Sequence, residues 1–239
     1  MKTTSRPVLL LMAGRTLGSA VSFIVPLVLV RIFDQAEFGT YKQLFLVYFS
    51  LYGIAHFGMA ESLFYFVPLG PLEAGRCVLN SVLTLTGAGV LSLGLLWGLD
   101  ARVALWLSNA GIARLLPFIG GLLLFMLASS VLEIVLTSRH RFLWASVAYA
   151  GSDLVRAACF VVPVLLFRRL EALLIGALVF GLVRSVAALL YLRREFGAGL
   201  RADATVLRRQ LSYAVPFGLA GVIGILESNF HQYAVSHLF

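Results

Sequence analysis

Three arginines lie inside long apolar stretches of the sequence, at Arg15, Arg156 and Arg184. A charged side chain within an apolar helix is costly, so it usually faces a polar interior or a cavity. The guanidinium group stays charged when water is removed, and it matches a phosphate with two parallel hydrogen bonds. The sequence therefore predicts a cationic site for a phosphate-bearing ligand. For Arg15, near the start of its stretch, the alternative is that its head reaches the lipid headgroups.

A polar stripe accompanies one of these arginines. Ser146, Tyr149, Asp153 and Arg156 follow each other at i, i+3, i+7 and i+10, so they share one face of a helix. The last two are spaced to form an ion pair. This face is expected to line a cavity or an interface between lobes, and the alternative is a sealed ion pair. Tyr149 joins the three arginines as a predicted substrate-binding residue.

The second apolar stretch carries a carboxylate and an aromatic stripe. Tyr48, Tyr52 and His56 repeat every four residues, and Glu61 follows among aromatic residues. The stripe is either a wall for a sugar-bearing substrate or simple packing. Glu61 and Asp153 are the carboxylates predicted to moderate the positive charge or to exchange a coupling ion, H⁺ or Na⁺. Glu133, near the end of a stretch that leads to Arg139, is expected to be a charge at the membrane interface.

Metal, cofactor and catalytic patterns are missing from the sequence. The two cysteines and four histidines show none of the ligand spacings of zinc sites. The connectors between apolar stretches are short and lack a DxD motif or a histidine-rich stretch. The sequence therefore predicts no cofactor and no enzymatic activity.

Composition places all these residues in an all-α integral membrane protein. Hydrophobic residues make up 60% of the chain and charged residues 13%, about half the share of a soluble domain. The net charge of +8 comes from arginines between apolar stretches, which orient membrane helices, so no nucleic-acid partner is expected. Lipid requires every backbone polar group to be paired, which favours helices. Seven stretches are long enough to cross a bilayer, at 8–32, 43–69, 78–99, 117–137, 143–166, 173–192 and 214–236.

The distribution of lysine and arginine predicts the orientation. With the N-terminus inside, ten of the 19 basic residues lie on the cytoplasmic side, six lie outside and three lie within spans. The connector at 193–212 is the longest and most charged, which makes it the expected boundary between a six-helix lobe at 1–206 and one further helix at 207–239. The expected location is the cytoplasmic (inner) membrane, with membrane lipids as neighbours.

Two short motifs resemble a known family. Residues 30–41 read VRIFDQAEFGTY, and residues 208–216 read RRQLSYAVP, before the last span. Both resemble polysaccharide-export flippases of the Wzx type, in the superfamily that also contains the MATE multidrug exporters. In hydropathy and spacing the resemblance covers the whole chain.

The resemblance implies two six-helix lobes around a central cavity that opens alternately to each side. It implies a lipid-linked oligosaccharide on a polyprenyl pyrophosphate as the substrate, facing basic cavity residues, and ion-coupled transport. The alternatives are a MATE-like multidrug exporter and a membrane-embedded glycan ligase or polymerase. Since family members have about twelve helices, the seven stretches predict one lobe and the first helix of the second. The chain is then expected to be a fragment or a truncated product, and a half-transporter that dimerises is the less favoured alternative.

Overall fold

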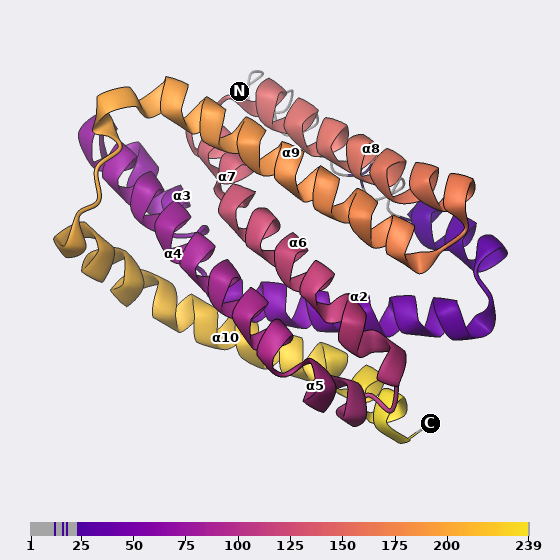
Figure 1. Ribbon diagram of the computed structural model, residues 1–239. Helices are drawn as coiled ribbons and strands as arrows, with labels where there is room; N and C mark the ends of the chain where they lie inside the picture. Colours follow the sequence, from indigo (N-terminus) through magenta and orange to yellow (C-terminus); the bar gives the residue numbers. More distant parts are fainter. Residues whose placement is uncertain (1–11, 13–15, 17, 19–22, 239) are drawn as a thin grey trace.

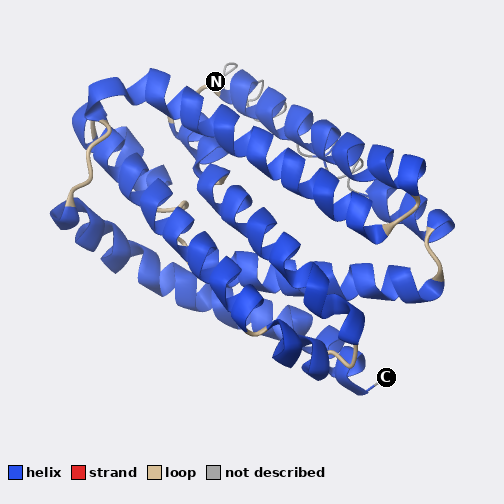
Figure 2. Ribbon diagram, in the orientation of Figure 1, coloured by secondary structure: helices blue, strands red, loops and turns tan. Residues whose placement is uncertain are grey.

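The computed structural model describes residues 12, 16, 18 and 23–238, and within this part every regular element is a helix (Figures 1 and 2). Among these described residues, five helical segments are long and apolar enough to cross a membrane. These are Glu73–Gly98, Ala110–Ser138, Phe142–Phe167, Leu170–Gly199 and Ala204–Ser236. The predicted all-α class with membrane-spanning helices is therefore supported, whereas the predicted number of seven spans is not confirmed.

The first two predicted spans differ from the remaining five. Most of the stretch at 8–32, with Arg15, lies outside the described residues, and the helix at Phe23–Ile32 is short. The stretch at 43–69 is divided into α2 (Gln35–His56), α3 (Leu63–Phe66) and the 3-10 helix η1 (Val67–Leu69). Asp34 caps the start of α2, where its Oδ1 accepts a hydrogen bond from the Glu37 amide at 2.7 Å. Phe57 and Gly58 both have positive φ, which ends α2 well before the predicted boundary.

The third and fourth spans form the centre of the bundle. α4 (Pro71–Gly98) leads through α5 (Asp100–Trp106) and η2 (Ala110–Leu115) to α6 (Leu116–Ser129) and α7 (Val131–Ser138). The hydroxyls of Ser129 and Ser130 donate to backbone carbonyls one turn back, and such bonds bend helices, which accounts for the break between α6 and α7. α6 lies between α4 and α9 in Figure 1, and its span is the most buried of the five.

The next two helices form a hairpin. α8 (Phe142–Phe167) ends at Arg168, which has the left-handed backbone conformation, and α9 (Leu170–Phe196) returns beside it. Gly176 of α9 lies against the Cys159 carbonyl of α8, in a space that a Cβ atom would fill. Close contact at a small residue is a common way for membrane helices to pack.

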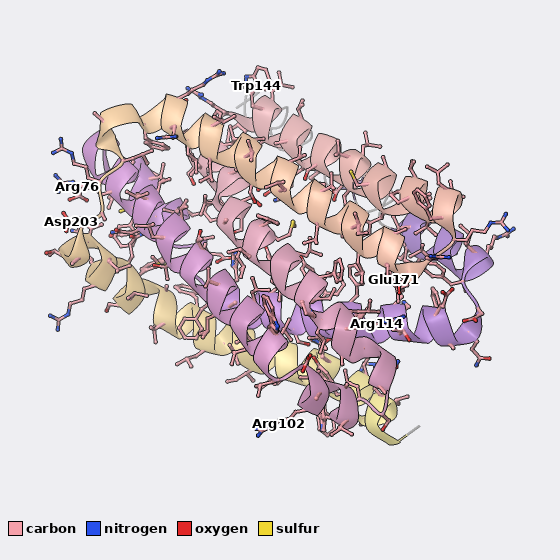
Figure 3. All side chains as sticks on the ribbon, in the orientation of Figure 1. Arg76, Arg102, Arg114, Trp144, Glu171 and Asp203 are labelled. Atoms are coloured by element: carbon pink, nitrogen blue, oxygen red, sulfur yellow. The ribbon has the colours of Figure 1, made fainter. Side chains whose placement is uncertain are left out.

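The last helix, α10 (Ala204–Leu238), lies along α2 and α4. The connector predicted at 193–212 is in fact short, because α9 continues to Phe196 and α10 already begins at Ala204. Asp203 caps α10 by accepting from the amides of Thr205 and Val206, and it pairs with Arg76 of α4 at 3.0 Å (Figure 3). Farther along, the buried Gln210 side chain donates to the Cys77 carbonyl at 3.2 Å. The start of α10 is therefore anchored to α4, and the division of the chain at residue 206 stays a prediction.

Candidate functional site

A cavity of about 720 Å³ lies between α2, α6, α8, α9, α10 and the helix at Phe23–Ile32. Aromatic rings make up much of its wall, and Lys42 and Arg156 supply positive charge. Asn229 and Gln232 of α10 add polar groups. The lining residues are Val25, Pro26, Tyr41, Lys42, Phe45, Leu46, Tyr48, Phe49, Tyr52, Leu122, Met126, Arg156, Phe160, Phe180, Asn229 and Gln232. The volume is in the range of small-molecule sites.

One wall of the cavity is a ladder of rings on α2. Tyr48 and Tyr52 stack with their centroids 5.8 Å apart, and the rings of Tyr52 and His56 follow at 5.5 Å. Toward the start of α2, Phe45 contacts Tyr41 at 4.8 Å. The four-residue spacing predicted this stripe, and both tyrosines of the predicted stripe line the cavity.

Arg156 lies on the wall in an ion pair with Asp153, at 2.7 Å between Nη2 and Oδ1. The predicted pairing of these two residues is confirmed. The side chains of Arg156 and Asp153 keep 30% and 27% of their surface exposed, so the pair is not sealed. Gly18 lies so close to Asp153 that a Cβ atom there would collide with the carboxylate.

A second, more deeply buried ion pair joins Arg184 of α9 to Glu133 of α7. Arg184 Nη2 lies 2.7 Å from Glu133 Oε1, and Nη1 donates to Ser152 Oγ of α8 at 3.3 Å. Only 5% of the Glu133 side chain and 19% of the Arg184 side chain is exposed. Arg184 Nε is buried and has no acceptor in the described part of the chain. This pair therefore ties three helices together.

The expectation that Glu133 is an interface charge beside Arg139 is wrong. Arg139 instead pairs with Glu195 at 2.7 Å, and Arg141 pairs with the same carboxylate at 2.8 Å. Glu133 lies on the inward face of α7, which turns it toward α9. A pair separated by about 50 positions in the sequence leaves no local spacing signal, which explains why the helix-end position of Glu133 was misleading.

Glu61 lies in the turn between α2 and α3, because α2 ends at His56. It pairs with His56 at 3.1 Å, and about half of its side chain is exposed. His56 also contacts the end of the aromatic ladder. Glu61 is therefore placed one step beyond the ladder rather than in the cavity wall.

The remaining predicted residues are distributed unevenly around the cavity. Arg15 lies outside the described residues. Arg184 and the half-buried Tyr149 are not part of the cavity lining. Arg184 still acts on the cavity wall at a distance, because its charge interacts with the lining residue Tyr48, as does the charge of Arg156. Among the predicted substrate-binding residues in the described part of the chain, the lining therefore includes Arg156 alone.

Three polar lining residues were missed from the sequence: Lys42, Asn229 and Gln232. Asn229 and Gln232 are spaced by three residues within an apolar helix, and that spacing was the available signal. Lys42 follows Phe38 by one turn, and its Nζ lies 5.5 Å from the centroid of that ring. Among residues 23–238 and the three described before them, no three His, Cys, Asp or Glu side chains form a group that could hold a metal ion.

No known protein family, no curated protein and no solved structure matches the chain.

Proposed function

We propose that the protein is a membrane transporter that flips a lipid-linked oligosaccharide, carried on a polyprenyl pyrophosphate, across the cytoplasmic membrane by alternating access. The observation that carries the proposal is the aromatic cavity with Arg156 and Lys42 in its wall, inside a bundle of membrane-length helices. A coupling ion, H⁺ or Na⁺, exchanged at Asp153 or Glu61, is part of the same proposal.

The chemistry of the lining suits both parts of such a ligand. Tyrosine presents a broad apolar ring and a hydroxyl, so the ladder on α2 offers stacking area and hydrogen bonds to a sugar. The Arg156 guanidinium offers two parallel donors to a phosphate. Because the Arg156–Asp153 pair is partly exposed, a pyrophosphate can take over the guanidinium without leaving a buried charge behind.

A MATE-like multidrug exporter is the second candidate, and the charge of the lining disfavours it. Lys42 and Arg156 are both cations, and the described lining contains no carboxylate to attract a cationic drug. A glycan ligase or polymerase needs an acid, a base or a nucleophilic carboxylate at the substrate. The described lining has no Asp, Glu or His, which disfavours catalysis in this cavity.

The test is a flipping assay on the protein in proteoliposomes, with a fluorescent oligosaccharide on a polyprenyl pyrophosphate as cargo. The expected result is that Arg156→Gln lowers the initial rate at least tenfold. Arg102→Gln, an exposed arginine outside the cavity lining, is the matched control and should keep the wild-type rate. If wild-type vesicles flip no faster than empty ones, or if they export ethidium instead, the proposal is refuted.

A further inference from the structure

Ion pairs bring four segments together at one end of the bundle, which we call the basic end: the start of α4, the turn between α7 and α8, the end of α9 and the start of α10. Glu73 and Asp203 tie α4 to α10, and Glu195 ties α9 to the α7–α8 turn. The arginines of these pairs are Arg76, Arg139, Arg141 and Arg209. The Gly199 carbonyl, just after α9, lies against Gly75 of α4 and joins the two groups.

Positive charge exceeds negative charge at the basic end. Residues 73–76, 139–141 and 193–209 contain eight arginines and three carboxylates, and all three carboxylates are already in ion pairs. Four exposed arginines have no ion pair with any described residue: Arg193, Arg194, Arg201 and Arg208. Their guanidinium groups are therefore free to take an anion from outside the chain.

Two of these arginines end an apolar stripe on the outer face of α9. This helix packs mainly against α6 and α8, at the edge of the bundle (Figure 1). Six apolar side chains, spaced by three or four residues along its other face, are each 40–54% exposed. They form the α9 stripe: Val179, Leu182, Val183, Val186, Leu189 and Leu190. Arg193 and Arg194 continue the same face by one turn, so two cations lie where an apolar surface of a membrane-length helix ends.

The opposite end of α9 has a different charge environment. Arg168 and Arg169 precede the helix there, but Glu171 lies in its first turn. Glu37, near the start of α2, is close enough to interact electrostatically with both Asp34 and Glu171. These three carboxylates weaken the attraction of this end for an anionic headgroup.

We propose that the end of α9 binds an anionic phospholipid of the surrounding membrane, with its phosphate at Arg193 and Arg194 and an acyl chain along the α9 stripe. A guanidinium offers a phosphate two parallel hydrogen bonds. A choline headgroup adds a cation, which the surplus positive charge of the basic end repels. The α9 stripe favours a lipid over a soluble anion, because only a lipid has a chain to place on it. The inference does not depend on the transported cargo, since it needs only a membrane around the helices.

The test measures the dissociation constant of the first bound lipid by native mass spectrometry of the purified protein in a neutral detergent. The lipids are dioleoylphosphatidylglycerol, which is anionic, and dioleoylphosphatidylcholine, which has the same chains and no net charge. Arg193→Gln combined with Arg194→Gln removes the two proposed contacts. Arg168→Gln combined with Arg169→Gln is the matched control, because these two arginines are also adjacent and exposed and lie at the other end of α9.

The wild-type protein should bind the anionic lipid about tenfold more tightly than the neutral one, and the control variant should keep this preference. The Arg193→Gln and Arg194→Gln variant should reduce the preference to below about threefold. If the two double variants reduce it equally, the preference reflects the overall charge of the protein and the proposed site is wrong. A wild-type protein without any preference would also overturn the proposal.

A second pair of variants tests the place of the acyl chain. Val186→Asn combined with Leu190→Asn makes the α9 stripe polar and should weaken both lipids by a similar factor, so that the preference stays. Val162→Asn combined with Leu166→Asn, two exposed positions with the same spacing on α8, is the control and should weaken neither lipid. If the α9 variant also weakens neither lipid, the chain does not lie on the α9 stripe.

Glycerophosphoglycerol, the headgroup without its chains, separates a lipid site from a site for any phosphate. At about a tenfold excess over the lipid it should leave the bound anionic lipid in place, because it lacks the contribution of the buried methylene groups. If it displaces the lipid, the arginines bind phosphate without help from the α9 stripe, and the assignment to a membrane lipid is wrong.

Discussion

Replacing Glu133 with glutamine tests whether the Glu133–Arg184 pair holds α7, α8 and α9 together. The variant keeps the shape of the side chain and removes its charge, so the Arg184 guanidinium stays buried without a carboxylate to balance it. Removing one partner of a buried pair typically costs about 3–5 kcal/mol. For a chain of this size each kcal/mol lowers the unfolding midpoint by about 2–4 °C, so we expect a fall of roughly 6–20 °C.

The assay is thermal unfolding of the purified chain in detergent, followed by circular dichroism. Glu171→Gln is the control, because it breaks the exposed pair with Arg114 (Figure 3), whose side chains are 41% and 76% exposed. Such a pair contributes less than about 1 kcal/mol. Replacing Glu133 and Arg184 together by leucine and methionine should restore stability to about the wild-type level, since the isolated charge is removed. If Glu133→Gln costs no more than Glu171→Gln, or if the double variant is as unstable as the single one, the pair does not lock the helices.

Three further predictions concern the start of α10, the α8–α9 contact and the cavity wall. Backbone amides of α10 and the Arg76 guanidinium hold the pKa of Asp203 below its ordinary value of 3.8. The stabilising effect of the Asp203 carboxylate is therefore complete above about pH 4, and it is lost as the pH falls through the lower pKa of the folded state. Asp203→Asn should flatten the dependence of the unfolding midpoint on pH in that window. Gly176→Ala should lower the free energy of unfolding, measured by denaturant titration, by about 1–3 kcal/mol, because its Cβ would meet a carbonyl of α8. Gly94→Ala, which has open space around it, is the control and should leave the free energy of unfolding unchanged or raise it by up to about 1 kcal/mol. Asp153→Asn removes the anion that competes with a phosphate for Arg156. A gain of about 1 kcal/mol in binding free energy should make geranyl pyrophosphate bind roughly fivefold more tightly in calorimetry. Weaker binding would show that the carboxylate instead holds the guanidinium in position.

Local spacing predicted the parts of the candidate site that lie on single helices. The interval of three residues placed Asp153 beside Arg156, and the interval of four placed Tyr48 beside Tyr52. Neither interval contains information about which helices are neighbours. The partner of Glu133 therefore remained hidden, because only the packing of α7 against α9 brings the two side chains together.

Helix boundaries show the same limit. The apolar stretch at 43–69 contains no proline before Pro68, yet α2 already ends at Phe57, which has a left-handed conformation and is followed by Gly58, also with positive φ. There Gly218 of α10 packs against Phe57, in a space that a Cβ atom would fill. The bend is therefore associated with a helix more than 150 positions away, and as a consequence Glu61 leaves the line of the span. Hydropathy predicts that a segment is buried in lipid, but a turn stabilised by tertiary contacts has no signal in it.

The two arginine pairs near the cavity differ in burial, and this difference decides which guanidinium is available to a ligand. Arg184 is enclosed with Glu133, so separating them would leave two desolvated charges, each costing several kcal/mol. Arg156 and Asp153 are both about one-quarter to one-third exposed, so either can exchange its partner for water or for a phosphate at little cost. A cation that binds and releases a ligand in each cycle of the proposed transport has to be exchangeable in this way. Arg156 therefore suits the ligand site, and Arg184 suits a fixed joint between the helices that frame it.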